Sequence, residues 1–209
     1  MSTRDIVLVT IFLITFVSLV SWLGRPGRGT EVGDQALVPD EQSGAPAGAI
    51  DSQGPAEIVS SELASLLSPR RDRGYPWDLI VVHHSGGDRG DATSISTSPR
   101  TPHFVIGNGA GMKMGEIVPT ELWQEQRPGS HAGAAAIDRR AIGITLVGNY
   151  SRREPPLLQL DSARRLVTAL RQRLEIPPGN VLRHDELGAM ATLCPGKIPV
   201  TGLARGEAR

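Results

Sequence analysis

Residues 78–87 read Asp78-Leu-Ile-Val-Val-His-His-Ser-Gly-Gly87, and this stretch decides the class of fold. An unbroken β-branched run is typical of a strand that is covered on both faces. The same reasoning predicts strands at 103–107, 115–118, 141–148 and 181–184. Apolar residues then recur every three or four positions from Leu160 to Leu174, which predicts an amphipathic helix. These elements suggest an α/β or α+β sheet with helices packed against it, and of the two we expect the α/β fold, with a central mixed β-sheet flanked by helices.

The composition excludes several classes of protein. The chain has 209 residues with 22 basic and 22 acidic side chains, which suits one ordinary domain with appendages. Because the charge is balanced and no basic run occurs, we expect no binding to nucleic acid. Cys194 is the only cysteine in the sequence, so no intramolecular disulfide can form.

The first 24 residues form an apolar segment that predicts a membrane anchor. Residues 6–23 hold eighteen residues without a charge, nearly enough to span a bilayer core as one transmembrane helix. A cleaved signal peptide is the alternative, but the first Ala-x-Ala site, at 45–47, lies far downstream. Either interpretation implies export.

The chain between this segment and the first strand is predicted to be a tether. Residues 25–70 are rich in Gly, Pro, Ser, Asp and Gln, and could form one short helix near Ser60, either packed on the domain or transient. The folded domain is expected at 71–203, with a tail at 204–209.

Three residues of types that bind metals fall at the ends of predicted segments: His83, His184 and Cys194. Two imidazoles and one thiolate suit zinc, and they leave a fourth tetrahedral position for water, as in catalytic zinc sites. Taken singly, each residue has a plainer interpretation, since a strand-end histidine is often only hydrogen-bonded and a lone cysteine often only packs in the core.

Five ordered motifs carry a resemblance to a known family. They are V-V-H-H-S-G at 81–86, H-F-V-I-G-N-G at 103–109, G-S-H-A-G at 129–133, I-G-I-T-L-V-G-N-Y at 142–150, and R-H-D-E-L with T-L-C-P-G-K at 183–197. Over about residues 78–197 the chain resembles the type-2 N-acetylmuramoyl-L-alanine amidases, whose superfamily includes the peptidoglycan recognition proteins.

The resemblance implies a zinc hydrolase that cuts the amide between N-acetylmuramic acid and L-alanine in peptidoglycan. It assigns His83, His184 and Cys194 as the zinc ligands, in agreement with the residue types. It also places His84 in the wall of the substrate groove, and His131 and Thr192 beside the reacting centre. A peptidoglycan substrate implies a domain on the outer side of the cell membrane, anchored by a single pass or secreted after signal cleavage.

The resemblance does not identify a general base. Relatives carry Tyr before the His-Phe or Asn-Phe strand and Glu after Ile-Gly-Ile, whereas this chain has Pro102 and Thr145. The candidates to replace them are His131, Glu116, Asp185 and Glu186. A module that binds peptidoglycan in the same groove without hydrolysing it is therefore the alternative function.

Two segments differ in length or pattern from the relatives. Nine residues separate His184 from Cys194 where relatives have seven, so we expect a bulge at 188–190 or a displaced thiol. Residues 85–101 show little helical periodicity where relatives carry a helix. This pattern predicts a cleft wall that is missing, open or supplied by another segment.

Overall fold

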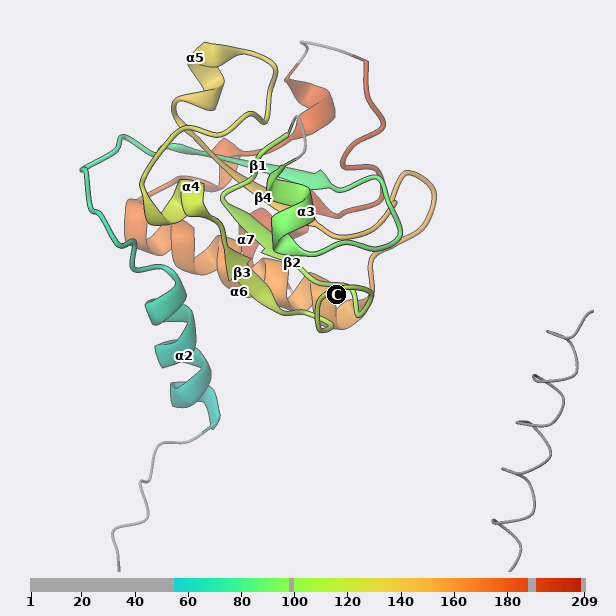
Figure 1. The fold of residues 1–209 in the computed structure, drawn as a ribbon, viewed down its shortest axis with the longest axis horizontal. Coiled ribbons are helices and arrows are strands. Elements are labelled where there is room, and N and C mark those ends of the chain that lie inside the picture. Colours follow the sequence, from blue (N-terminus) through green and yellow to red (C-terminus); the bar gives the residue numbers. More distant parts are fainter. Residues whose placement is uncertain (1–54, 98–99, 188–190, 208–209) are drawn as a thin grey trace, which may run out of the picture. The chain divides into compact units, whose positions relative to one another are not determined.

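The computed structural model describes residues 55–97, 100–187 and 191–207, and within them a five-stranded sheet lies at the centre (Figure 1). The strand order is β3-β2-β4-β1-β5. The β4–β1, β1–β5 and β2–β4 pairs are parallel and the β2–β3 pair is antiparallel. The strands are β1 (Leu79–His84), β2 (Phe104–Ile106), β3 (Ile117–Pro119), β4 (Ala141–Leu146) and β5 (Val181–Arg183). The predicted α/β fold with a mixed sheet is confirmed.

Six helices accompany these strands in the described ranges. They are α2 (Pro55–Leu66), α3 (Ala92–Ser96), α4 (Glu121–Gln124), α5 (Ala135–Asp138), α6 (Leu157–Leu174) and α7 (Val200–Arg205). Short 3₁₀ turns occur at Pro178–Asn180 and His184–Glu186. The helix expected near Ser60 is present, and Leu67, just after it, is buried in the core.

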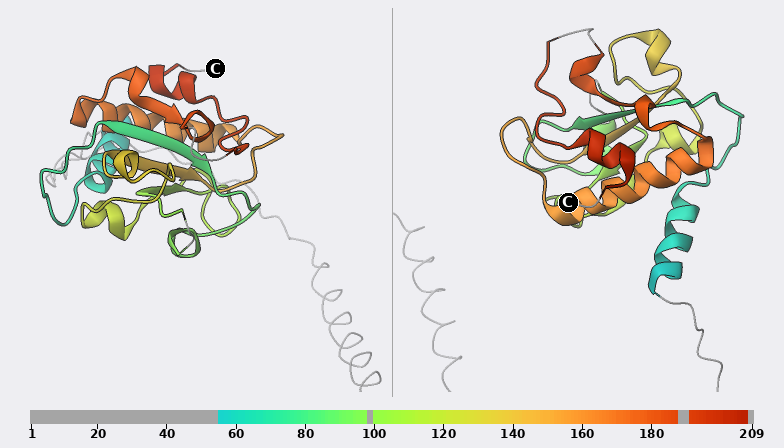
Figure 2. Two further views of the ribbon diagram at one scale, coloured as in Figure 1. Left: turned by 90° about the horizontal axis from the view of Figure 1, so that it is seen from above. Right: turned by 180° about the vertical axis from the view of Figure 1, so that it is seen from behind.

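The two faces of the sheet differ in what covers them (Figure 2). Helix α6 packs on one face through Leu160, Ala163, Leu166, Val167 and Leu170, which join alternate strand residues in the main core. The other face has a small cluster of Ile95, Val105, Met112 and Val147 beneath α3. Because this second cluster is small, most of that face is left for polar side chains.

The expectation of little helical structure in residues 85–101 is wrong for part of that stretch. Helix α3 has five residues and begins at a capping box, in which Asp91 Oδ1 accepts from the Ser94 backbone N–H at 2.8 Å. Its buried Ile95 packs against Val105 and Met112. A single buried position cannot produce a periodic pattern, so the sequence indicated only the cap.

Both the predicted membrane segment at 6–23 and the predicted bulge at 188–190 lie outside the described residues. Among the residues that are described, no helix is long and apolar enough to cross a membrane.

Candidate metal centre

The candidate metal centre begins with a row of side chains across the sheet. His83 in β1 pairs in register with Thr145 in β4, which pairs with Val105 in β2. On the other side, Val82 pairs with Arg183, the last residue of β5, so His184 follows at the level of His83. Parallel strands end at the same edge of a sheet, and this brings the two histidines together.

Cys194 completes the group from a segment 111 residues away in sequence from His83. Ligand atoms of His83, His184 and Cys194 all lie within 4.8 Å of one another. The Cys194 Sγ is 3.7 Å from His83 Nδ1. A tetrahedral zinc, with bonds of about 2.05 Å to nitrogen and about 2.3 Å to sulfur, would separate these two atoms by about 3.6 Å. The longer spacing between His184 and Cys194 therefore does not displace the thiol from the histidines.

The protonation states of these residues also suit a metal. Burial, followed by the charges of His131 and His184, lowers the pKa of His83 well below its usual value. Burial and then the Arg100 charge lower the pKa of His184, whose buried Nδ1 has no hydrogen-bond partner among the described residues. Both rings are thus neutral at pH 7 and have a lone pair to offer a cation.

Without a cation, Cys194 is a neutral thiol. Burial raises its pKa to about 11, opposed by the backbone N–H of His84, which donates to Cys194 Sγ at 3.3 Å. A metal ion would have to displace the thiol proton, because thiolate is the form that binds zinc. The residues present therefore fit zinc in donor type, spacing and available lone pairs.

A turn at residues 148–150 holds the ligand-bearing segments together. The Gly148 carbonyl accepts from the Gly86 N–H at 3.0 Å, next to the His83 strand. The Tyr150 carbonyl accepts from the Lys197 N–H at 2.8 Å, three residues after Cys194. This turn therefore connects the two chain segments that supply His83 and Cys194.

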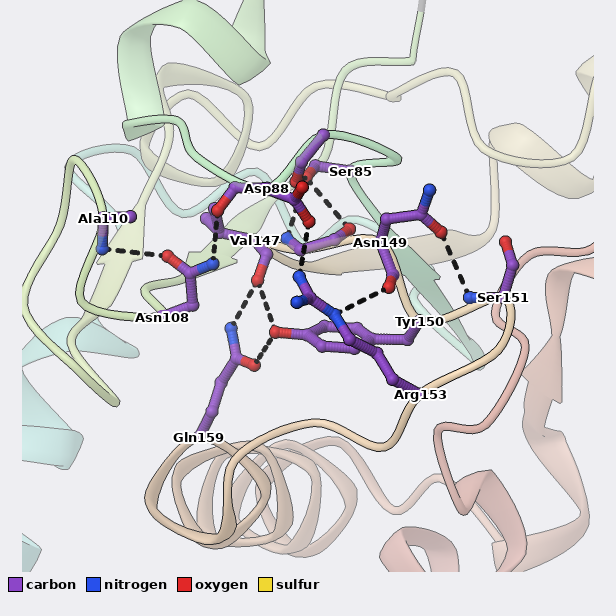
Figure 3. A network of polar contacts seen from close by, with 12 residues as sticks. Ser85, Asp88, Asn108, Ala110, Val147, Asn149, Tyr150, Ser151, Arg153 and Gln159 are labelled. Carbon is purple, nitrogen blue, oxygen red and sulfur yellow. Dashed lines mark hydrogen bonds and ion pairs between the residues drawn. The ribbon is translucent and has the colours of Figure 1, made fainter.

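Gln159 of α6 supports the turn from below (Figure 3). Its side chain is fully buried, and its Nε2 donates to the Ile106 carbonyl at 2.8 Å and the Val147 carbonyl at 3.0 Å. The Tyr150 hydroxyl lies 2.6 Å from Gln159 Oε1 and 2.7 Å from the Val147 carbonyl. Figure 3 also shows Arg153 reaching across the turn toward Asp88.

His84 and Thr192 contact the ligand segments in ways that the resemblance did not imply. Strand alternation turns the His84 side chain away from the face of His83, and its Nε2 lies 3.3 Å from Ser151 Oγ. Thr192 Oγ1 accepts from the Cys194 N–H at 3.2 Å and so fixes the backbone at the thiol. The roles of His84 in the groove wall and of Thr192 at the reacting centre remain predictions.

His131 lies in the same site. Its ring centroid is 5.8 Å from that of His83, and its side chain is 2% exposed. Asp138 Oδ1 holds this loop by accepting from the backbone N–H groups of His131 and Ala132 at 2.7 and 2.8 Å. Burial, and then the charge of His184, lowers the pKa of His131 to about 3, so its ring is neutral at pH 7.

The three acidic candidates for a general base hydrogen-bond to groups outside the metal ligands, and they differ in their distance from the site. Glu116 precedes the far edge strand β3, and its Oε2 accepts from the Lys113 N–H at 2.9 Å. Asp185 accepts from the Arg183 guanidinium at 2.9 and 2.7 Å, and Glu186 accepts from the Arg183 N–H at 3.2 Å. Strand order therefore removes Glu116 from the site, while Asp185 and Glu186 stay beside His184.

Sequence reasoning missed Gln159, Asp138 and Arg100. Gln159 lies in the amphipathic helix α6, and the sequence pattern did not distinguish it from the rest of that helix. A polar residue on the apolar face of a helix is a signal from which its role could have been predicted. Asp138 stands seven residues after His131, and only the tertiary contact shows its role. Arg100 precedes a strand with no motif of its own, yet its charge lowers the pKa of His84 and His184 after burial.

Comparisons with known proteins identify the family. A family model described as N-acetylmuramoyl-L-alanine amidase matches residues 73–197. The chain therefore belongs to this family, within the superfamily of type-2 amidases and peptidoglycan recognition proteins. Comparison with curated proteins gives no match.

Comparison with solved structures finds amidases and peptidoglycan recognition proteins. The N-acetylmuramoyl-L-alanine amidase LysC from Clostridium intestinale URNW is 23% identical, with a TM-score of 0.51 over 67% of this chain and 90% of that one. Human PGRP-IBETAC, solved in complex with glycosamyl muramyl pentapeptide, is 18% identical, with a TM-score of 0.46 over 59% and 79%. The Drosophila peptidoglycan recognition protein SD is 20% identical, with a TM-score of 0.45 over 66% and 86%. The similarity to LysC shows the fold alone and does not decide between hydrolysis and recognition.

Proposed function

We propose that this protein is a zinc-dependent amidase that hydrolyses the bond between N-acetylmuramic acid and L-alanine in peptidoglycan. The observation that carries the proposal is the grouping of His83, His184 and Cys194, whose ligand atoms lie within 4.8 Å of one another. Three protein ligands leave a fourth position free, which is the arrangement of catalytic rather than structural zinc. A module that only bound peptidoglycan would have no need of this open position.

The metal ligands and the groups that contact them would have separate roles. When bound, zinc supplies polarisation of the amide carbonyl and activation of water at neutral pH. His83 and His184 offer neutral nitrogens, and the N–H of His84 would stabilise the Cys194 thiolate by its hydrogen bond. The 148–150 turn holds the segments of His83 and Cys194 in place, which preserves the site between turnovers.

His131 is assigned as a hydrogen-bond donor to the reacting carbonyl oxygen. A general base works best with a pKa near the working pH, and a pKa of about 3 is far below it. A neutral imidazole nevertheless carries one N–H group, which can stabilise developing negative charge. Removal of such a donor typically reduces kcat by about 100- to 1,000-fold.

The second candidate function is peptidoglycan recognition without hydrolysis. Pro102 and Thr145 occupy the positions where relatives carry Tyr and Glu, and neither side chain transfers protons near pH 7. Thr145 is buried and pairs in register with His83 on the neighbouring strand. It therefore occupies the place in the site where a general base would be expected. A positioned base typically contributes about 100- to 10,000-fold, so its absence predicts slow turnover.

Incubation with muropeptides separates the two functions. The full chain, purified in detergent and loaded with zinc, is expected to release new L-alanine amino termini, detected by mass spectrometry. Cys194→Ser is expected to bind zinc more weakly and to lose this activity. Leu157→Ser serves as the matched control, because Leu157 is 71% exposed on α6, on the opposite side of the sheet. Saturable binding of muropeptides by the zinc-loaded chain without amine release would establish the recognition function instead.

We also propose that the domain is held outside the cytoplasm by residues 6–23 as a single-pass membrane anchor, with secretion after cleavage as the alternative. The support is the eighteen-residue uncharged segment and the extracytoplasmic location of a peptidoglycan substrate. The N-terminal sequence of the mature protein distinguishes the two, since a start near Ala47 would show cleavage.

A further inference from the structure

We propose that His103 is a positioning residue that builds the space in which His131 is held, and thereby sets the rate of the amidase reaction. The inference rests on the proposed function for its effect on rate. Its structural part stands on contacts that involve none of the three candidate metal ligands.

His103 bridges two separate backbone segments. It is fully buried just before β2, where its Nδ1 accepts from the Gly143 N–H at 3.0 Å. Its Nε2 lies 2.9 Å from the Arg127 carbonyl oxygen. Because Nδ1 accepts a backbone N–H, the ring proton must be on Nε2, which then donates to Arg127. Both ring nitrogens are thus used, and a single neutral tautomer satisfies them.

The two bridged segments are the walls around the His131 ring. A Cβ placed on Gly143 would lie 2.2 Å from His131 Cε1 and Nδ1, and one placed on Gly129 would lie 2.3 Å from His131 Cε1 and Nε2. The His131 ring therefore lies against the bare backbone of both glycines, in a space that we name the His131 slot. The Gly143 N–H donates directly to His103 Nδ1. Gly129 comes two residues after Arg127, whose carbonyl oxygen is the partner of His103 Nε2. The His103 ring consequently sets the distance between the two walls.

The His103 ring packs against the rings of Trp77 and His131. The Trp77 ring meets the His103 ring edge-on at 4.7 Å, and Trp77 Nε1 donates to Gln126 Oε1 at 2.7 Å. The centroid of the His103 ring is also 5.1 Å from that of the His131 ring. A side chain that is fixed at both nitrogens and packed against two rings can transmit its position to His131.

Three substitutions at His103 separate its two hydrogen bonds. His103→Asn can place an oxygen near the position of Nδ1 and keep the Gly143 bond. His103→Gln can place an amide nitrogen near the position of Nε2 and keep the Arg127 bond. His103→Leu removes both bonds while it keeps an apolar group beside Trp77. Asn and Gln keep the test valid if the leucine variant does not fold.

The kinetic test is a double-mutant cycle with His131→Ala in the full chain loaded with zinc. We expect His103→Leu to lower kcat for muropeptides by about 10- to 100-fold, the range typical for loss of a hydrogen bond that orients a group in the site, with KM and zinc content unchanged. In the His131→Ala background the same substitution should change kcat less than twofold. His103→Asn and His103→Gln should fall between wild type and His103→Leu. An equal effect in both backgrounds, or none in either, would overturn the proposal.

An independent measurement needs no enzymatic activity. The chain has five histidines, so ¹⁵N-histidine labelling gives a short set of imidazole NMR signals. We expect the His131 signals to move in each His103 variant. The matched control is Leu157→Ser, in which they should stay in place. Unmoved His131 signals in all three His103 variants would refute the slot itself, whereas moved signals in a chain without turnover would refute only the proposed amidase function.

Discussion

Zinc binding should release one proton that comes from Cys194. Burial raises the pKa of the Cys194 thiol to about 11, whereas burial lowers the pKa of His83 well below its usual value and also lowers that of His184. At pH 6.0 the thiol is therefore almost wholly protonated, and it must lose its proton when it binds zinc as a thiolate. Cys194→Ser should bind zinc more weakly and release about one proton fewer per zinc than the wild type.

The size of the pH effect follows from the pKa of the thiol. Five pH units separate pH 6.0 from a pKa of about 11, and at about 1.36 kcal/mol for each unit the deprotonation costs about 7 kcal/mol. Structural zinc sites bind with an apparent free energy of about 10–16 kcal/mol at pH 7, so zinc can offset this cost. The apparent Kd for zinc should fall about tenfold with each unit of rising pH below the thiol pKa.

Isothermal titration calorimetry measures this proton directly. Zinc is titrated into the chelator-stripped full chain at pH 6.0 in two buffers with different ionisation enthalpies, and the difference in heat gives the protons released per zinc. Water activated by zinc ionises near pH 7 and adds little at pH 6.0. Equal proton release by wild type and Cys194→Ser would refute the reasoning that the cysteine binds zinc as a thiolate.

Three further predictions concern the support of the site and its placement in the cell. Gln159→Leu removes the three hydrogen bonds beneath the 148–150 turn, so thermal unfolding should show a loss of about 1–3 kcal/mol and a Tm lower by about 2–12 °C; an unchanged Tm would contradict this. Gly143→Ala places a methyl 2.2 Å from the His131 ring and should cost about 1–3 kcal/mol in denaturant unfolding, a cost that His131→Ala in the same chain should relieve. A reporter enzyme that works only outside the cytoplasm should be active when it is fused after Arg209. An inactive fusion of this kind would reject the proposed topology.

The strands and the amphipathic helix could be predicted because their signals are local. The β-branched run before His83 and the three-and-four spacing from Leu160 to Leu174 each report burial within one element. The sequence did not predict helix α3, because Ile95 is its only buried residue and a single apolar position cannot show helical periodicity. The interpretation of 85–101 failed for that physical reason.

The sequence by itself determined the donor chemistry of this protein: two histidines at or next to the ends of predicted strands, one cysteine, and no titratable group at Pro102 or Thr145. Those properties belong to single residues and survive in any fold that buries the strands. Only the tertiary structure decided that His83 Nδ1 and Cys194 Sγ, 111 residues apart in sequence, lie 3.7 Å from each other. It also decided that the His103 ring is held as a single tautomer by its two hydrogen bonds beside the His131 slot. These features depend on which strands pair and where the chain returns, because proximity and burial come from long-range contacts that no local pattern encodes.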